Sequence, residues 1–93
     1  MFQFLTSLES TIENRKKTLP EGSYTTTLFR GGADRILRKI GEEAGEVIIA
    51  GKNQNSDEIK NEMADLFFHL LIFLHHSGLQ FKDVVEVLEK RQS

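Results

Sequence analysis

The 93-residue sequence contains no cysteine, no tryptophan and only one proline. Without cysteine, a disulfide scaffold, a zinc–thiolate site and thiol catalysis are all excluded. Long apolar runs are also lacking, because the longest nearly apolar stretch, residues 66–74, contains a histidine and is too short to span a bilayer. The N-terminus has no basic segment followed by an apolar one, so we expect a cytoplasmic protein that does not insert into membranes.

The composition that remains is typical of a globular protein, with 39% hydrophobic and 28% charged residues. The length predicts one domain spanning residues 1–93. A chain of this size buries only about two-thirds of its unfolded surface, so a lone monomer would be marginally stable. The net charge of −2 argues against a protein that coats nucleic acid.

Apolar residues recur at three- and four-residue spacing in four segments, which predicts helices over residues 2–17, 34–50, 57–76 and 81–90. The segment 24–29 is rich in threonine, but no second strand is available to pair with it, so we expect a loop with a short helix closed by Gly31 and Gly32. Ser23, Asp34 and Asn55 are candidate helix caps. The predicted fold is all-α, a four-helix bundle completed by dimerisation.

The charges are segregated along the chain. Residues 15–39 hold seven basic and two acidic residues, whereas residues 42–65 hold seven acidic and two basic ones. Such blocks are either solvated helix faces or parts of a site that needs both signs. Carboxylates that hold a divalent cation beside lysines and arginines that contact phosphate would be such a site.

Acidic side chains lie three residues apart on two neighbouring predicted helices. Glu43 and Glu46 share one helix face, and Glu62, Asp65 and His69 share a face of the next helix. The short linker favours an antiparallel pair, which would bring these faces together. Four converging carboxylates are electrostatically unfavourable unless a cation completes them, and oxygen ligands favour Mg²⁺ or Mn²⁺. Salt-bridged helix faces remain the alternative.

Two segments of this region resemble a known signature. KIGEEAGE (residues 39–46) and EMAD (62–65) are similar to the EExxE…ExxD signature of the MazG-like all-α nucleotide pyrophosphohydrolases. Further matches narrow the resemblance to the phosphoribosyl-ATP pyrophosphatase family, over residues 5–91. They are PEGSYT (20–25), the glycine pair 31–32, Lys39 and DLFFHL (65–70). Gly45 departs from the expected alanine or threonine without touching the acidic positions.

The resemblance implies an enzyme of histidine biosynthesis. It would hydrolyse phosphoribosyl-ATP at the α–β phosphoanhydride to phosphoribosyl-AMP and pyrophosphate, the second step of the pathway. Mg²⁺, with Mn²⁺ as a substitute, would be the cofactor. The implied ligands are Glu43, Glu46, Glu62 and Asp65, with Glu42 as a further catalytic acid that orients water.

The implied substrate-binding residues combine basic, hydroxyl and glycine positions: Lys16, Lys17, Gly22, Ser23, Tyr24, Thr25, Arg35 and Lys39. Several have simpler interpretations. Lys39 would also pair with Glu43 four residues on, and Ser23 would serve as a cap alone. We expect His69 to be structural, orienting Asp65, and we expect no chemistry from His75 or His76.

Two other functions remain open. A house-cleaning pyrophosphohydrolase for other nucleotides would keep the metal site, and a non-catalytic helical dimerisation module would not. Whatever the function, the apolar segment 66–74 predicts a homodimer, with Phe68, Ile72 and Phe73 exposed in an isolated chain. A dimer would also allow the basic segment of one chain to approach the acidic residues of the other.

Overall fold

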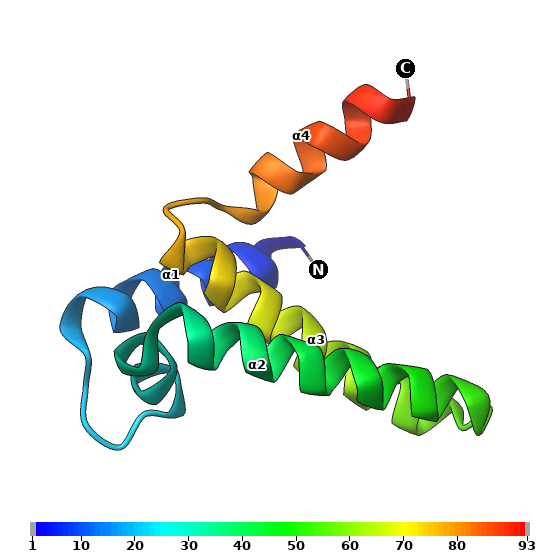
Figure 1. The fold of residues 1–93 in the computed structure, drawn as a ribbon. Coiled ribbons are helices and arrows are strands. Elements are labelled where there is room, and N and C mark those ends of the chain that lie inside the picture. Colours follow the sequence, from blue (N-terminus) through cyan, green and yellow to red (C-terminus); the bar gives the residue numbers. More distant parts are fainter. Residues whose placement is uncertain (1, 93) are drawn as a thin grey trace.

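A computed structural model gives the structure of the chain and describes residues 2–92. Four helices follow one another: α1 (Phe2–Thr18), α2 (Tyr24–Lys52), α3 (Ser56–His76) and α4 (Phe81–Gln92). α2 and α3 run side by side as a long antiparallel pair, α1 crosses one end of this pair, and α4 leads away from it (Figure 1). The predicted all-α, four-helix architecture is confirmed. The single domain remains a prediction, and residues 1 and 93 lie outside the described part of the chain.

The helix ends follow the cap residues in the sequence. The Ser23 side chain accepts a hydrogen bond from the Thr26 backbone N–H at 3.4 Å, and Asn55 Oδ1 accepts one from Glu58 at 3.1 Å. Both satisfy N–H groups that the first helical turn leaves unpaired. α3 ends at His76, and Ser77 is its C-cap. Gly78 then takes the left-handed conformation, φ 77°, that ends many helices. The caps thus set where α2 and α3 begin.

The expectation of a loop with a short helix over residues 24–29 was wrong for the loop and correct for the helix. This segment forms the first turns of α2, which continues to Lys52 across a kink at Gly32, φ 75° and ψ −168°. Tertiary contacts override the threonine content, because Thr26 is buried and its hydroxyl donates to the Pro20 carbonyl at 2.7 Å. Asp34, expected as a cap, lies in the first turn after the kink instead.

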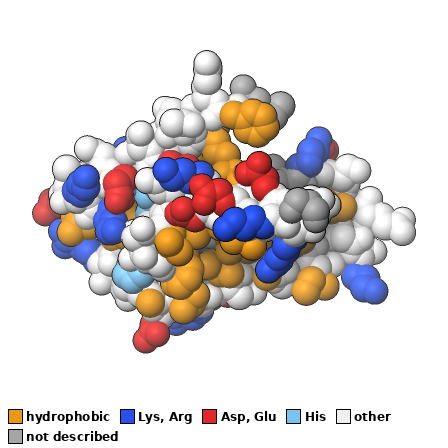
Figure 2. Space-filling view, turned by 90° about the horizontal axis from the view of Figure 1, so that it is seen from above, with side chains coloured by type: hydrophobic (Ala, Val, Ile, Leu, Met, Phe, Trp, Pro, Cys, Tyr) orange, Lys and Arg blue, Asp and Glu red, His pale blue; other side chains and the backbone are white. Residues whose placement is uncertain are grey.

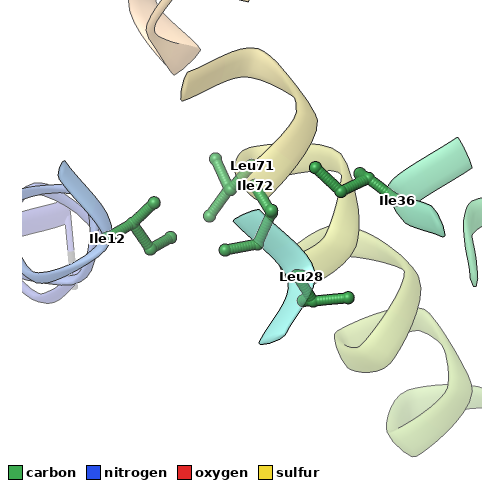
Figure 3. Packing of buried hydrophobic residues seen from close by; sticks show 5 residues of the cluster. All are labelled: Ile12, Leu28, Ile36, Leu71 and Ile72. Atoms are coloured by element: carbon green, nitrogen blue, oxygen red, sulfur yellow. The ribbon is translucent and has the colours of Figure 1, made fainter. Parts of the chain in front are cut away.

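The core lies where α1, α2 and α3 meet. It consists of Ile12 from α1, Leu28 and Ile36 from α2, and Leu71 and Ile72 from α3 (Figure 3). Leu28 precedes the Gly32 kink and Ile36 follows it, so both arms of α2 contribute to one cluster. The kink therefore allows the segment before it to pack against the rest of the molecule.

A polar junction joins α1 to the end of α3 and the start of α4. His75 is buried, its Nε2 lies 2.8 Å from Glu9 Oε1, and its Nδ1 lies 3.4 Å from Glu13 Oε2. Glu9 also accepts from the Phe81 backbone N–H at 2.8 Å, and Lys16 donates to the His75 carbonyl at 2.8 Å. His75 thus connects the end of α3 to α1 through Glu9 and Glu13.

Apolar side chains are exposed on α3 and α4, but not the ones expected. Ile72 is fully buried within the chain, and Phe68 and Phe73 are half-buried against the core. The exposed large apolar side chains of α3 are instead Met63, Phe67 and Leu70. α4 exposes Val84, Val87 and Leu88 as well. On the face viewed in Figure 2, apolar side chains lie open between acidic and basic ones. Within residues 2–92, no helix has the length and hydropathy needed to cross a membrane.

Candidate metal centre

Carboxylates from α2 and α3 meet in the middle of the antiparallel pair. One oxygen each from Glu43, Glu62 and Asp65 lies within 4.8 Å of the others. The spacing of three residues on α3 directs Glu62 and Asp65 to the same side, where they face α2. Glu43 is 7% exposed, Glu62 is half-buried and Asp65 is exposed, so the cluster extends from the helix interface to the surface.

Glu46, the fourth predicted ligand, is exposed and does not belong to the three residues whose oxygens lie within 4.8 Å of one another, but it lies near enough to Glu62 to interact with it. Hydrogen bonding to Glu62 raises the pKa of Glu46 above its ordinary value, and the charge of Glu62 adds to the effect. The pKa of Glu43 is also raised, first by burial and then by its hydrogen bond with Glu46 and the nearby negative charges. Like charges this close oppose one another's ionisation, which raises the pKa of both glutamates when no cation is bound.

The oxygens of the cluster fit a hard divalent cation. Among the described residues, Glu43 Oε2 and Glu62 Oε2 are buried without a hydrogen-bond partner. A buried carboxylate oxygen left unpaired is costly, and a cation would compensate both oxygens at once. Oxygen-only ligands suit Mg²⁺ or Mn²⁺ rather than softer metals. The predicted convergence of the two helix faces is thus present, and the donor set is compatible with a metal.

Lys39 is the cation beside the cluster. Its Nζ lies 3.4 Å from Glu42 Oε2 and 3.6 Å from Glu43 Oε1. The Tyr24 hydroxyl raises the pKa of Lys39 most, the two carboxylates raise it further, and partial burial acts in the opposite direction. Both interpretations of Lys39 are therefore compatible with the structure. Lys39 pairs with Glu43, and its positive charge lies next to the carboxylates, as a substrate-binding residue would require.

Tyr24 is connected to α3 through His69. Its hydroxyl lies 2.8 Å from His69 Nε2, and His69 Nδ1 lies 2.7 Å from the backbone oxygen of Asp65. His69 therefore contacts the main chain of Asp65 and not its carboxylate, and the expected role of orienting Asp65 stays a prediction. The hydrogen bond between Tyr24 and His69 was missed, because no spacing in the sequence relates residues 45 positions apart.

The other residues of the 20–25 segment have structural partners. The hydroxyl of Ser23 caps α2 and accepts from Arg15 at 3.1 Å, and Thr25 is buried. Gly22 has φ 80°, a conformation that L side chains rarely adopt. Arg35 folds back over Gly31, where a methyl group would meet its side chain at 2.4 Å.

Lys16 and Lys17 are not brought to the carboxylates. Lys16 is held at the polar junction by the carbonyl of His75 and by Glu13 at 3.8 Å. Lys17 lines a pocket at the same junction. His75 lies ten residues beyond Asp65, about 15 Å along α3. Within one chain, these two lysines therefore lie at the polar junction and not at the carboxylate cluster.

Comparison with known proteins gives one family. Residues 5–92 match the family described as phosphoribosyl-ATP pyrophosphohydrolase. Two similar curated proteins are named phosphoribosyl-ATP pyrophosphatase. The protein of Leptospira biflexa is 54% identical over 98% of this chain and 99% of its own length. That of Clostridium acetobutylicum is 43% identical over 96% of this chain and 81% of its own length.

Longer proteins match as well. The histidine biosynthesis bifunctional protein HisIE of Bacillus subtilis is 52% identical over 99% of this chain, which spans 44% of that protein. The chain thus corresponds to a whole protein in some relatives and to less than half of a protein in others.

Proposed function

Because the chain belongs to the phosphoribosyl-ATP pyrophosphohydrolase family, we propose that it hydrolyses phosphoribosyl-ATP between its α and β phosphates. The products would be phosphoribosyl-AMP and pyrophosphate, the second step of histidine biosynthesis. The single observation that carries the proposal is the match over residues 5–92, which includes every carboxylate of the cluster. The bifunctional relatives are named for the same pathway, which supports this substrate over other nucleotides.

Four carboxylates would hold the metal: Glu43, Glu46, Glu62 and Asp65. We propose Mg²⁺, for which Mn²⁺ would substitute, because the donors are all oxygens. When bound, Mg²⁺ supplies positive charge that offsets the charge developing on the leaving pyrophosphate. The exposed Asp65 lies at the open side of the cluster, which is the side from which phosphates would approach.

The remaining residues would position substrate and water. Hydrolysis requires a water oxygen to attack the α phosphorus while the bond to the β phosphate oxygen breaks, and the water must lose a proton. Glu42 is exposed and adjacent to Glu43, so its carboxylate is available to orient this water and accept the proton. Lys39 would contribute positive charge to the phosphate oxygens.

The substrate contacts that we propose near this site come from Gly22, Ser23, Tyr24, Thr25 and Arg35. Tyr24 is the best supported of them, because this residue is 47% exposed and so accessible to a ligand. Thr25 is buried and would act through its backbone. Lys16 and Lys17 would contact substrate only from a partner chain.

We propose that the working unit is a homodimer built on α3 and α4. None of the residues of α4, Phe81–Gln92, is buried within the chain. An apolar groove between α3 and α4 is lined by Phe67, Leu70, Leu74, Phe81, Val84 and Leu88. Large apolar patches of this kind are uncommon on monomers, and a two-fold interface would cover the same surface on both chains.

Turnover on a substrate panel tests the proposed reaction. Phosphoribosyl-ATP, dUTP, dCTP and ATP would be compared with Mg²⁺ present, with phosphoribosyl-ATP expected to give the highest kcat/KM. In ¹⁸O-labelled water, the label should enter phosphoribosyl-AMP and not pyrophosphate, because water attacks the α phosphorus.

The same panel separates the other candidate functions. Preference for dUTP or dCTP would show a house-cleaning pyrophosphohydrolase and overturn the proposed substrate. If no nucleotide were hydrolysed and Mg²⁺ gave no saturable rise in Tm, the chain would be a helical dimerisation module instead.

A further inference from the structure

A buried histidine at the end of α3 has a carboxylate at each of its ring nitrogens. His75 is 5% exposed. Its Nε2 lies 2.8 Å from Glu9 Oε1, and its Nδ1 lies 3.4 Å from Glu13 Oε2. Both glutamates belong to α1, and the pocket beside the ring is lined by α1, by His75 and by residues 78–80. The ring therefore lies where α1, α3 and the start of α4 meet.

The protonated ring is the form that satisfies both contacts. An ionised carboxylate only accepts hydrogen bonds, and a neutral imidazole has a single N–H. A neutral His75 would donate to one glutamate and turn a lone pair toward the other. The imidazolium has a hydrogen on each nitrogen, so it donates to both Glu9 and Glu13, and its charge offsets theirs.

Glu9 connects the ring to α4. Its Oε1 accepts from His75 Nε2 and from the Phe81 backbone N–H, both at 2.8 Å. Phe81 is the first residue of α4, where helical N–H groups lack intrahelical partners and a negative charge is favourable. None of the residues of α4 is buried within the chain, so a contact at its first residue affects how firmly the helix is held.

Few other charged groups lie around the ring. Lys16 donates to the His75 carbonyl at 2.8 Å and lies 3.8 Å from Glu13 Oε1, and Lys17 lines the pocket. The turn between α3 and α4 carries no charged side chain, and Asp83 of α4 accepts from a backbone N–H of that turn at 2.8 Å. Loss of the ring's charge would therefore remove one hydrogen bond and leave the two glutamates with less positive charge beside them.

We propose that His75 is a pH-sensitive link whose imidazolium joins Glu9 to Glu13 and thereby secures the start of α4, and that loss of one ring hydrogen loosens this helix. The secured state is favoured on the acidic side of the ring's titration and weakened on the alkaline side. The ring lies about 15 Å along α3 from Asp65, so the metal site should not depend on it.

Nuclear magnetic resonance tests the proposal by following the ring and the helix in the same samples. Histidine ordinarily titrates near pH 6.5, so the range would be about pH 5.5 to 9. Long-range ¹H–¹⁵N spectra report the hydrogens of His75, and amide exchange, corrected for the intrinsic rate at each pH, reports the protection of α4. Protection of Phe81 and of residues 84–88 should fall about tenfold as the ring loses a hydrogen, the loss expected for one hydrogen bond to a charged group.

The two transitions should have the same midpoint, because one causes the other. Protection of α4 that stays constant while the ring titrates would overturn the proposal. So would a His75 ring that carries only one hydrogen at pH 5.5.

Variants of the ring and of its partner assign the effect. His75→Gln cannot become charged, so α4 should be about tenfold less protected at pH 5.5 and its protection should no longer depend on pH. Should this variant fail to fold, Glu13→Gln still carries the test. Its amide can accept from Nδ1 or donate to it, so it suits both forms of the ring, and the pH dependence should become smaller.

His76→Gln is the matched control. The ring of His76 stacks on Phe73, with centroids at 6.5 Å, and the substitution should keep the pH dependence of the unchanged protein. A dependence of full size in both His75→Gln and Glu13→Gln would show that another group is responsible and would overturn the proposal.

Two further measurements separate this inference from the proposed function. Mn²⁺ binding, followed by electron paramagnetic resonance, should be the same in His75→Gln and in the unchanged protein, and the exchange results would hold even if phosphoribosyl-ATP were not hydrolysed. All the contacts lie within one chain, so the pH dependence should persist on dilution. A dependence that disappeared on dilution would assign the effect to association of chains and overturn the inference.

Discussion

At the scale of single residues, Glu43 links the charge of the site to the stability of the fold. Its pKa is raised, mainly by burial, so the folded state binds its proton more tightly than the unfolded chain does. Stability that depends on this proton is present below the ordinary glutamate pKa of about 4.3 and is lost as pH rises through the folded value. Without metal, the protein should therefore lose stability as pH rises from 4.5 to 8.

Glu43→Gln should remove this dependence. The amide cannot ionise, so the metal-free variant should have a higher Tm than the unchanged protein at pH 8 and a similar Tm at pH 4.5. Thermal unfolding in the presence of a chelator measures both. A wild-type Tm that rises with pH over this range would contradict the assignment of the buried carboxyl group.

Asp65 tests the catalytic role of the cluster, because it is exposed and its removal leaves no cavity. Asp65→Ala should lower kcat/KM at least 100-fold, since a metal ligand is lost, and should leave the metal-free Tm unchanged or slightly higher because repulsion is relieved. Asp57→Ala is the control on the same helix, with a side chain that is 89% exposed and lies 3.4 Å from Lys60 Nζ. Near-normal turnover in Asp65→Ala would remove this residue from the site.

The carboxylates could be predicted from the sequence because each pair is local. Glu43 with Glu46 and Glu62 with Asp65 are three residues apart, and helical periodicity alone places each pair on one face. The contact of Tyr24 with His69, and of His75 with Glu9, could not be predicted, because both join distant segments through the tertiary packing. Local spacing identifies a face, whereas only the fold identifies what lies opposite it.

At the scale of helices, Gly32 decides the course of α2. Its φ of 75° and ψ of −168° belong to a region that essentially only glycine occupies. Gly32→Ala should lower the free energy of unfolding by about 1–3 kcal/mol, since the kink would be strained. Denaturant unfolding measures the change.

Gly41 provides the control within the same helix. It has helical geometry, and a methyl group added there would meet no atom within 4 Å. Gly41→Ala should raise stability by about 0.5–1 kcal/mol, because glycine is entropically unfavourable within a helix. Equal effects of the two substitutions would show that the kink is not strained by a side chain.

The kink also explains why the start of α2 was not predicted. The glycine pair 31–32 and the preceding threonines indicate an interruption of the helix, and α2 is indeed kinked at Gly32. What the sequence does not reveal is that both arms are helical, because that depends on Leu28 and Ile36 reaching the same core.

At the scale of the whole molecule, the exposed apolar surface predicts a dimer of twice 10.6 kDa. Phe67→Glu should reduce the mass measured by light scattering to that of one chain, because each interface would bury two unpaired charges. Phe67 is 41% exposed within the chain, so the monomer should remain folded. Leu37→Glu, at a similarly exposed apolar position of α2, is the control. A wild-type chain that stays monomeric at micromolar concentration would refute the dimer.

The antiparallel pair of α2 and α3 has a consequence for the kinetics of folding. All four carboxylates lie on this one hairpin, closed by a short turn at residues 53–55. Contacts between segments so near in sequence form early, because little chain entropy is lost in closing the loop. The repulsion between the carboxylates would then oppose the step that limits the folding rate. Mg²⁺ present during refolding should therefore raise the folding rate constant measured by stopped flow, in addition to lowering the unfolding rate constant.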